Sequence, residues 1–329
     1  MKIGIINVNE ALTPNGGVRM QGVMWHDGLV AAGCECDLID FWKVYDWKSF
    51  DAIIVLGYGG FLRNLTNGLR PLCKKLVLAP IIDPHWGTGL YKFFTKYWGN
   101  HKHLGLTSRF HDLYLAKDLY DVILTRSEFE SMYAHKCLDI PMDKIKIVPL
   151  QVRTPMVDEI PQKENFVLHV SRLRSENKNV PRLIAAAIKY NFNLKLAGFL
   201  NGESDKQWLH SLIDGHDNIE YEGEVSEQKL LDLYDRAKVF ALPSLKEGVG
   251  MVALEAAGRG CEIVMTNDGA PKEYYNGLAY LVNPKSVDEI GKACVEALEQ
   301  GNKQPELLKF VKENYTPEAC SQKLIRALQ

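Results

Sequence analysis

The residues best suited to chemistry lie between Pro243 and Gly260, where the sequence reads PSLKEGVGMVALEAAGRG. This pattern predicts the end of a strand, a glycine-containing loop and an alanine-rich helix that begins near Met251. The first amides of a helix have no partner within it, and the helix dipole attracts anions, so this junction could bind a phosphate or sugar oxygens. The candidates for these contacts are Gly248, Val249, Gly250, Met251 and Val252.

Two carboxylates belong to the same segment. Glu247 stands in the loop, and Glu255 lies about one turn inside the expected helix. At this spacing the two side chains can address different parts of one elongated ligand. The residue types alone leave open that both are solvated acids beside a buried helix.

This segment, with the following TNDGAPKEY, resembles the donor-binding segment of the retaining glycosyltransferases of family 4, the glycosyl transferases group 1. Upstream, HVSRLRSENKNVPRLIAAA places Arg172 and Lys178 where that family has G-R-L and a later lysine, with Ser171 replacing the usual glycine. A third stretch, EYEGEVSEQKLLDLYDRAKVFALPS, has the family's order of strand, glycine, helix and strand. The resemblance covers residues 165–300 well and the amino-terminal half weakly.

The resemblance implies a nucleoside-diphosphate sugar as donor, with Glu255 accepting hydrogen bonds from the ribose and Glu247 contacting the transferred sugar; Glu273 is a weaker candidate. Departure of the diphosphate is limited by the negative charge that develops on the bridging oxygen. Arg172 and Lys178 would neutralise that charge, so we expect neither a metal ion nor a cofactor besides the donor. The alternative is that both cations are simply solvated.

Two glycine-containing stretches lie in the first half of the chain. NGGVRM, at 15–20, follows the first expected strand, and the resemblance implies that Gly16 and Gly17 close over the diphosphate; an ordinary turn is the alternative. LGYGGFLRN, at 56–64, has Leu62 where a dinucleotide fingerprint needs its third glycine, which argues against a nicotinamide enzyme.

The strand KLVLAPII ends in Asp83-Pro84-His85, whereas the family usually has a histidine, often followed by aspartate, at this place. Either side chain could orient an acceptor hydroxyl, or could serve as a cap or turn residue. No covalent nucleophile is evident, and the resemblance implies a front-face displacement in which the leaving phosphate takes the acceptor proton. The catalytic candidates are Asp83, His85, Arg172, Lys178 and Glu247.

The stretch YKFFTKYWGNHKH, at 91–103, interleaves aromatic and basic residues. This mixture is typical of a peripheral membrane contact and would suit a lipid-linked acceptor. The alternatives are a helix that packs its aromatic side chains into the core and a platform on which an acceptor sugar stacks.

The elements that position these residues are strands that alternate with helices in both halves of the chain. This alternation, with the resemblance, predicts an α/β fold of the GT-B type: two Rossmann-like domains facing each other across a cleft. Residues 1–155 are expected to form the acceptor domain and 156–308 the donor domain. A helix at 309–329 is expected to return to the first domain. A length of 329 residues fits two domains.

The net charge and the cysteines bear on which partners and bound metals to expect. The net charge of -2 gives no indication of a nucleic-acid partner, and the seven scattered cysteines suggest neither disulfides nor zinc. We expect a cytoplasmic glycosyltransferase, peripheral at the inner membrane face if 91–103 contacts lipid, that uses a nucleotide sugar and a glycan or lipid-linked acceptor. The alternatives are a non-catalytic sugar-nucleotide-binding scaffold subunit and another GT-B enzyme such as an epimerase.

Overall fold

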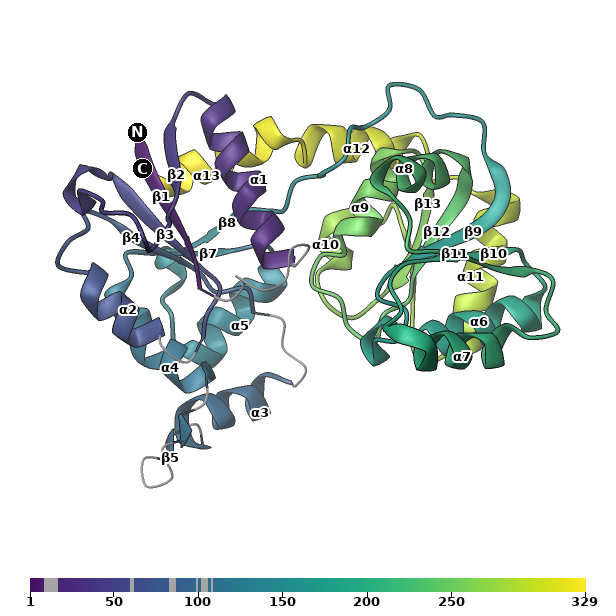
Figure 1. Ribbon diagram of the computed structural model, residues 1–329, viewed down its shortest axis with the longest axis horizontal. Coiled ribbons are helices and arrows are strands. Elements are labelled where there is room, and N and C mark those ends of the chain that lie inside the picture. The colour runs from purple at the N-terminus through teal and green to yellow at the C-terminus, as the bar shows by residue number, and fades with distance from the viewer. Residues whose placement is uncertain (9–16, 60–61, 83–86, 99, 102–105, 108) are drawn as a thin grey trace. The chain divides into compact units, whose positions relative to one another are not determined.

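The computed structural model describes residues 1–8, 17–59, 62–82, 87–98, 100–101, 106–107 and 109–329 (Figure 1). The chain folds into two compact units. Unit 1 comprises Met1–Gln151 and Pro317–Gln329, and unit 2 comprises Val152–Thr316. The predicted α/β class with two Rossmann-like domains is confirmed, since each unit contains a six-stranded sheet in which all the paired strands are parallel.

The sheet of unit 1 has the strand order β2-β1-β3-β4-β7-β8. Its strands are β1 (Lys2–Asn7), β2 (Glu35–Leu38), β3 (Ala52–Leu56), β4 (Leu76–Ala79), β7 (Val122–Thr125) and β8 (Ile145–Ile147). A separate antiparallel pair is formed by β5 (Asn100–His101) and β6 (Leu106–Thr107). The central strands are fully apolar, as expected of a sheet covered on both faces.

Helices cover both faces of this sheet. Along β3, Ile53 and Val55 face the core beneath α2 to α5, whereas Ile54 and Leu56 face α1 and α13, because successive side chains of a strand point to opposite faces. The helices of unit 1 are α1 (Gly17–Ala31), α2 (Leu62–Leu69), α3 (Thr88–Phe93), α4 (Arg109–Ala116), α5 (Glu128–Leu138) and α13 (Pro317–Leu328), and a π-helix at Phe94–Trp98 continues α3.

Unit 2 repeats the architecture with the strand order β11-β10-β9-β12-β13-β14. Its strands are β9 (Glu164–Val170), β10 (Leu194–Ala197), β11 (Ile219–Gly223), β12 (Ala237–Leu242), β13 (Glu262–Thr266) and β14 (Tyr280–Val282). Its helices are α6 (Val180–Tyr190), α7 (Gly202–Ile213), α8 (Glu227–Arg236), α9 (Met251–Gly258), α10 (Pro271–Tyr275), α11 (Val287–Gln300) and α12 (Glu306–Asn314).

Each strand order reverses direction at one point, between β1 and β3 in unit 1 and between β9 and β12 in unit 2. Loops that leave the carboxyl ends of the strands diverge at such a point and leave a crevice in which ligands bind. The order therefore singles out the residues that follow β9 and β12 before any side chain is considered.

The end of the chain differs from the prediction of one helix at 309–329, which is wrong. The structure has two helices instead. The first, α12, ends at Asn314, and the second, α13, begins at Pro317. Pro317 explains the break, because proline has no N–H to donate and is tolerated only in the first turn of a helix. The second helix returns to unit 1, where Lys75 Nζ donates to the carbonyl of Leu328 at 2.7 Å.

Within the described ranges, no helix is long and apolar enough to cross a lipid bilayer. All seven cysteines are free thiols.

Candidate functional site

The candidate donor site lies at the reversal of unit 2, where the segments after β9 and β12 run side by side. Arg172 and Lys178 follow β9, and Glu247 follows β12. The two strands are paired in parallel, so their carboxyl ends lie at the same edge of the sheet. The topology thus brings Lys178 and Glu247 together, and Arg172 lies in the same segment as Lys178, between β9 and α6.

Backbone and amide contacts join these two segments. The side chain of Asn177 donates to the carbonyl of Lys246 at 2.9 Å and accepts from its N–H at 3.1 Å. Asn179 is buried and donates to the carbonyls of Pro243 at 2.9 Å and Pro284 at 2.6 Å. Buried amides that are satisfied in this way hold the loops in one arrangement.

Lys178 and Glu247 form the central ion pair of the site. Lys178 Nζ lies 2.8 Å from Glu247 Oε2, and the hydroxyl of Ser244 donates to the same oxygen at 2.9 Å. Their side chains are 24% and 13% exposed, so the pair is shielded but reachable. In the part of the chain that the structure describes, the exposed Arg172 makes no side-chain hydrogen bond or ion pair. Its charge is therefore available to an anionic ligand.

Two glycines shape the loop that leads into α9. Gly250 has φ 75°, and a Cβ there would lie 2.4 Å from the Cε of Met265. Gly269 has φ 109°, and a Cβ there would lie 1.9 Å from the carbonyl oxygen of Glu247, with which it forms a β-bridge. Only glycine fits both the backbone conformation and the space at these positions.

The first turn of α9 presents its amides as predicted. The N–H groups of Ala253 and Leu254 donate to the carbonyl of Gly250, whereas those of Met251 and Val252 precede the first intrahelical bond. Gly248, Met251 and Val252 are half-buried. Val249 is different, because the residue is only 3% exposed and its side chain packs in the interior.

Glu255 is held by donors that the sequence analysis missed. Its carboxylate accepts from Arg153 Nε at 2.9 Å and from the Tyr234 hydroxyl at 3.1 Å, and the residue is 2% exposed. The hydrogen bond with Glu255 raises the pKa of Arg153, and burial raises the pKa of Tyr234, so both groups keep their protons. Arg153 begins the stretch RTPMVDEIPQKEN, at 153–165, which has few periodic apolar residues, so no pattern identified it.

A buried histidine underlies the cationic segment. His169 is fully buried in β9, and burial lowers its pKa to about 4, so the ring is neutral at pH 7. Nδ1 donates to the carbonyl of Ala241 at 2.8 Å, which leaves Nε2 to accept from the hydroxyl of Ser171 at 2.7 Å. Ser171 is thereby fixed directly before Arg172.

The structure describes only some of the candidate residues of unit 1. Gly16, Asp83 and His85 lie outside the described residues, and Gly17 is the exposed first residue of α1. In the segment 91–103, the described aromatic side chains divide between core and surface: Tyr91 is 2% exposed and Tyr97 is 73% exposed.

Unit 1 also has a pocket of about 310 Å³ at the carboxyl ends of β1 and β2. Its polar lining comes from Asn7, Arg19 and Asp40, and its aromatic lining from Phe41 and Trp42, of which Trp42 is 97% exposed. The sequence analysis missed this pocket, although two adjacent aromatic residues directly after an expected strand could have indicated it.

Comparison with known proteins agrees with this geometry. Residues 154–316, nearly all of unit 2, match the family described as Glycosyl transferases group 1. The O-antigen chain mannosyltransferase B of Escherichia coli is 24% identical over a match that covers 56% of this chain and 55% of that protein. The match thus spans about half the length of this curated relative.

Two solved structures resemble the chain over almost its whole length. Sucrose-phosphate synthase from Thermosynechococcus elongatus has a TM-score of 0.74 at 15% identity, covering 99% of this chain and 97% of that one. Anabaena HepE in complex with UDP and glucose has a TM-score of 0.71 at 13% identity, covering 100% and 99%. The fold is therefore the GT-B fold of these glycosyltransferase structures.

Proposed function

We propose that this protein is a cytoplasmic glycosyltransferase of family 4 that moves a sugar from a nucleoside-diphosphate sugar to an acceptor hydroxyl with retention of configuration. The observation that carries the proposal is the Lys178–Glu247 pair at the reversal point of the unit 2 sheet, in whose β9–α6 segment Arg172 has no ion-pair partner among the described residues. The names of the relatives, which include a mannosyltransferase for O-antigen chains, favour glycan assembly.

The residues suggest how the diphosphate leaves. Arg172 can bind two phosphate oxygens, Lys178 adds a point charge, and the amides of Met251 and Val252 face the same junction. The bond between the sugar C1 and the phosphate oxygen breaks, the acceptor oxygen bonds to C1 from the same face, and its proton passes to the released phosphate. Because protein cations neutralise the diphosphate, we propose that the reaction needs no metal ion or other cofactor.

Glu247 and Glu255 have separate roles in this proposal. Glu247 orients Lys178 and reaches the hydroxyls of the transferred sugar from the loop. Glu255 receives the ribose hydroxyls, and its contacts with Arg153 and Tyr234 fix the carboxylate before the donor arrives. A carboxylate positioned in advance loses little freedom on binding, which favours affinity.

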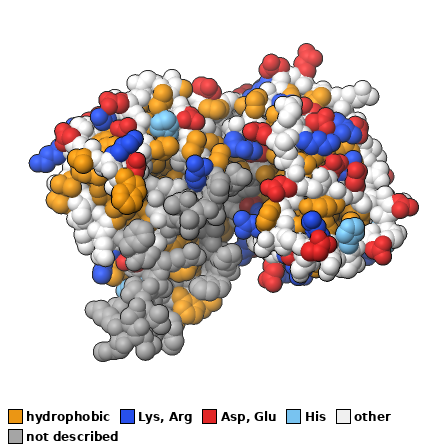
Figure 2. All heavy atoms as spheres, in the orientation of Figure 1, with side chains coloured by type: hydrophobic (Ala, Val, Ile, Leu, Met, Phe, Trp, Pro, Cys, Tyr) orange, Lys and Arg blue, Asp and Glu red, His pale blue; other side chains and the backbone are white. Residues whose placement is uncertain are grey.

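We propose the pocket of unit 1 as the acceptor site. An aromatic ring beside Arg19 and Asp40 suits a sugar, whose faces are apolar and whose rim carries hydroxyls. Figure 2 shows hydrophobic side chains on the surface of unit 1. Among the described residues of the segment 91–103, Phe93 and Tyr97 are exposed. We propose that these two side chains make the peripheral membrane contact of the segment, which would suit a lipid-linked acceptor.

The test begins with a thermal-shift screen against UDP-, GDP-, ADP- and dTDP-sugars with EDTA present, because a ligand that binds the native state raises its melting temperature. Mannose and glucose donors come first. Arg172→Ala should lose the shift. Arg174→Ala is the matched control, because it removes the same charge from the same loop, where Arg174 instead lies over the Trp208 ring at 4.5 Å.

Measurements of turnover then distinguish a glycosyltransferase from a scaffold subunit and from an epimerase. Release of the nucleoside diphosphate with an acceptor, and a product whose anomeric proton shows the donor's configuration by NMR, supports the proposal. A melting shift without turnover on any acceptor favours the scaffold subunit, and conversion of the donor sugar without an acceptor favours an epimerase. No shift with any sugar nucleotide would overturn the donor site itself.

A further inference from the structure

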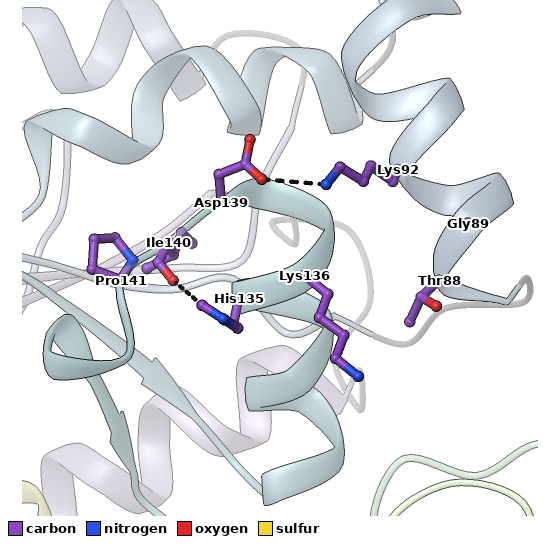
Figure 3. Close-up of a pocket in the computed structure, with 8 residues that line it drawn as sticks. All are labelled: Thr88, Gly89, Lys92, His135, Lys136, Asp139, Ile140 and Pro141. Atoms are coloured by element: carbon purple, nitrogen blue, oxygen red, sulfur yellow. Dashed lines mark hydrogen bonds and ion pairs between the residues drawn. The ribbon is translucent and has the colours of Figure 1, made fainter.

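A recess in unit 1, separate from the pocket at β1 and β2, lies between the start of α3 and the end of α5 (Figure 3). Its volume is about 660 Å³, and its lining includes Thr88, Lys92, His135, Lys136 and Asp139. Figure 3 shows Thr88 and Lys92 coming from α3 and His135 and Lys136 from α5, so two elements supply the polar groups. None of these residues belongs to the proposed donor or acceptor sites.

Positive charge exceeds negative charge in this recess. Asp139 is shared by two lysines: Lys96 pairs with Oδ2, and Lys92 Nζ lies 3.6 Å from Oδ1. The exposed Lys136 has no ion pair with any residue in the described part of the chain. Two ammonium groups therefore share one carboxylate, and the Lys136 side chain points away from Asp139 (Figure 3). Burial and the neighbouring charge of Lys92 lower the pKa of Lys96, as expected where cations are crowded.

The three lysines are not equally available. The side chain of Lys96 is only 14% exposed, so it remains with Asp139. Lys92 is 44% exposed, and its long contact with Asp139 is the kind of surface pair that contributes little to stability. Lys92 and Lys136 can thus both turn to a ligand without breaking a strong interaction.

Local structure explains part of this cluster. His135 and Lys136 occupy the last turn of α5, where cations stabilise the carbonyl end of a helix, and His135 Nδ1 donates to the carbonyl of Ile140 at 2.9 Å. Lys92 and Lys96 likewise lie in the last turns of α3 and of the π-helix that continues it. That preference does not explain why cations from two separate elements converge on Asp139.

We propose that this recess binds a phosphate-bearing anion with two or more negative charges, such as a diphosphate group. Such an anion would balance the excess charge of the lysines, and the Thr88 hydroxyl can donate to its oxygens. A phosphomonoester or diphosphate in solution and a lipid headgroup that ends in a phosphomonoester share this chemistry. The inference goes beyond the proposed function and does not depend on it.

The test uses inorganic pyrophosphate and the full chain. Amide chemical shifts in NMR spectra report residues 88–92 and 135–140 separately from unit 2, where pyrophosphate can also bind. We expect saturable shifts at the recess, and about tenfold weaker binding there for the double variant Lys92→Ala, Lys136→Ala. The control, Lys48→Ala with Lys146→Ala, removes the same charge from exposed positions of unit 1 and should bind as the parent does.

Co-sedimentation with phosphatidylcholine vesicles, with and without phosphatidic acid, identifies the source, because the phosphomonoester of phosphatidic acid can carry two negative charges. Binding that requires phosphatidic acid, is lost in the recess variant and is displaced by pyrophosphate indicates a lipid headgroup. Recess shifts with pyrophosphate and no vesicle binding indicate a soluble phosphate. The proposal is overturned if neither ligand perturbs the recess amides, or if the control pair weakens binding equally. The recess variant should keep the donor-induced melting shift, so failure here is distinct from failure of the donor site.

Discussion

The residues that follow the carboxyl ends of the strands differ in kind between the two units. At the edge of unit 2, charged side chains are held by buried polar groups, as Lys178 is by Glu247 and Ser244. At the edge of unit 1, apolar side chains stand in solvent: Trp42 is 97% exposed and Val44 is 100% exposed. A leaving diphosphate requires dipoles and charges fixed in advance, whereas an apolar ring can bind a sugar face without a supporting network. The comparison predicts that unit 2 substitutions affect chemistry and stability, and unit 1 substitutions affect acceptor affinity.

The largest effect is expected from breaking the central pair. Lys178→Ala removes a cation that faces the leaving diphosphate and leaves Glu247 without its partner, so kcat/KM should fall by roughly 10²–10³. The measurement is the initial rate of nucleoside-diphosphate release at saturating acceptor. Glu176→Gln is the control, because it changes an exposed charge in the same loop and should leave the rate within about twofold of the parent. Equal losses in both variants would mean that the loop, and not the cation, sets the rate.

The second-largest effect is expected from removing the ion pair between Arg153 and Glu255. Arg153→Ala leaves a carboxylate that is 2% exposed without its ion-pair partner, so the free energy of unfolding should fall by about 3 kcal/mol. Urea denaturation measures this change. Arg153 contacts both oxygens of Glu255, through Nε at 2.9 Å and Nη2 at 3.5 Å. Arg153→Lys keeps the charge but not both contacts and should recover part of the loss. An unchanged unfolding midpoint for Arg153→Ala would show that Tyr234 and solvent suffice to stabilise Glu255.

The sequence predicts the scaffold and the place of the site better than it predicts the contacts within it. Alternating strands and helices indicate the two sheets, and the spacing around Lys178 and Glu247 identifies the loops that meet. The partner of Glu255 was out of reach, because Arg153 lies 102 positions away in a stretch without apolar periodicity. His169 reads as one more strand residue, since periodicity shows burial but not the hydrogen bonds a buried side chain makes.

A smaller effect is expected from His169, through pH. Its folded-state pKa of about 4 lies below the ordinary 6.5, so between these values the unfolded chain binds a proton that the folded chain does not. The contribution to stability is therefore complete above pH 6.5 and declines as the pH falls toward 4, with a loss of about 2 kcal/mol at pH 5. His169→Gln should flatten this part of the stability curve. His210→Gln, at an exposed position, should leave the slope intact, and equal slopes in all three proteins would contradict the assignment.

The smallest effect, on unit 1, tests the other half of the comparison. Trp42→Ala removes a side chain that is 97% exposed, so the melting temperature should stay within about 1 °C of the parent. If the ring binds the acceptor sugar, the acceptor KM should rise by up to about tenfold, with the donor KM unchanged. Val44→Ala provides the control, because Val44 is equally exposed but does not line the pocket. A rise in donor KM instead would indicate that Trp42 contacts the nucleotide sugar. The proposed division, with anion binding in unit 2 and sugar stacking in unit 1, would then be wrong.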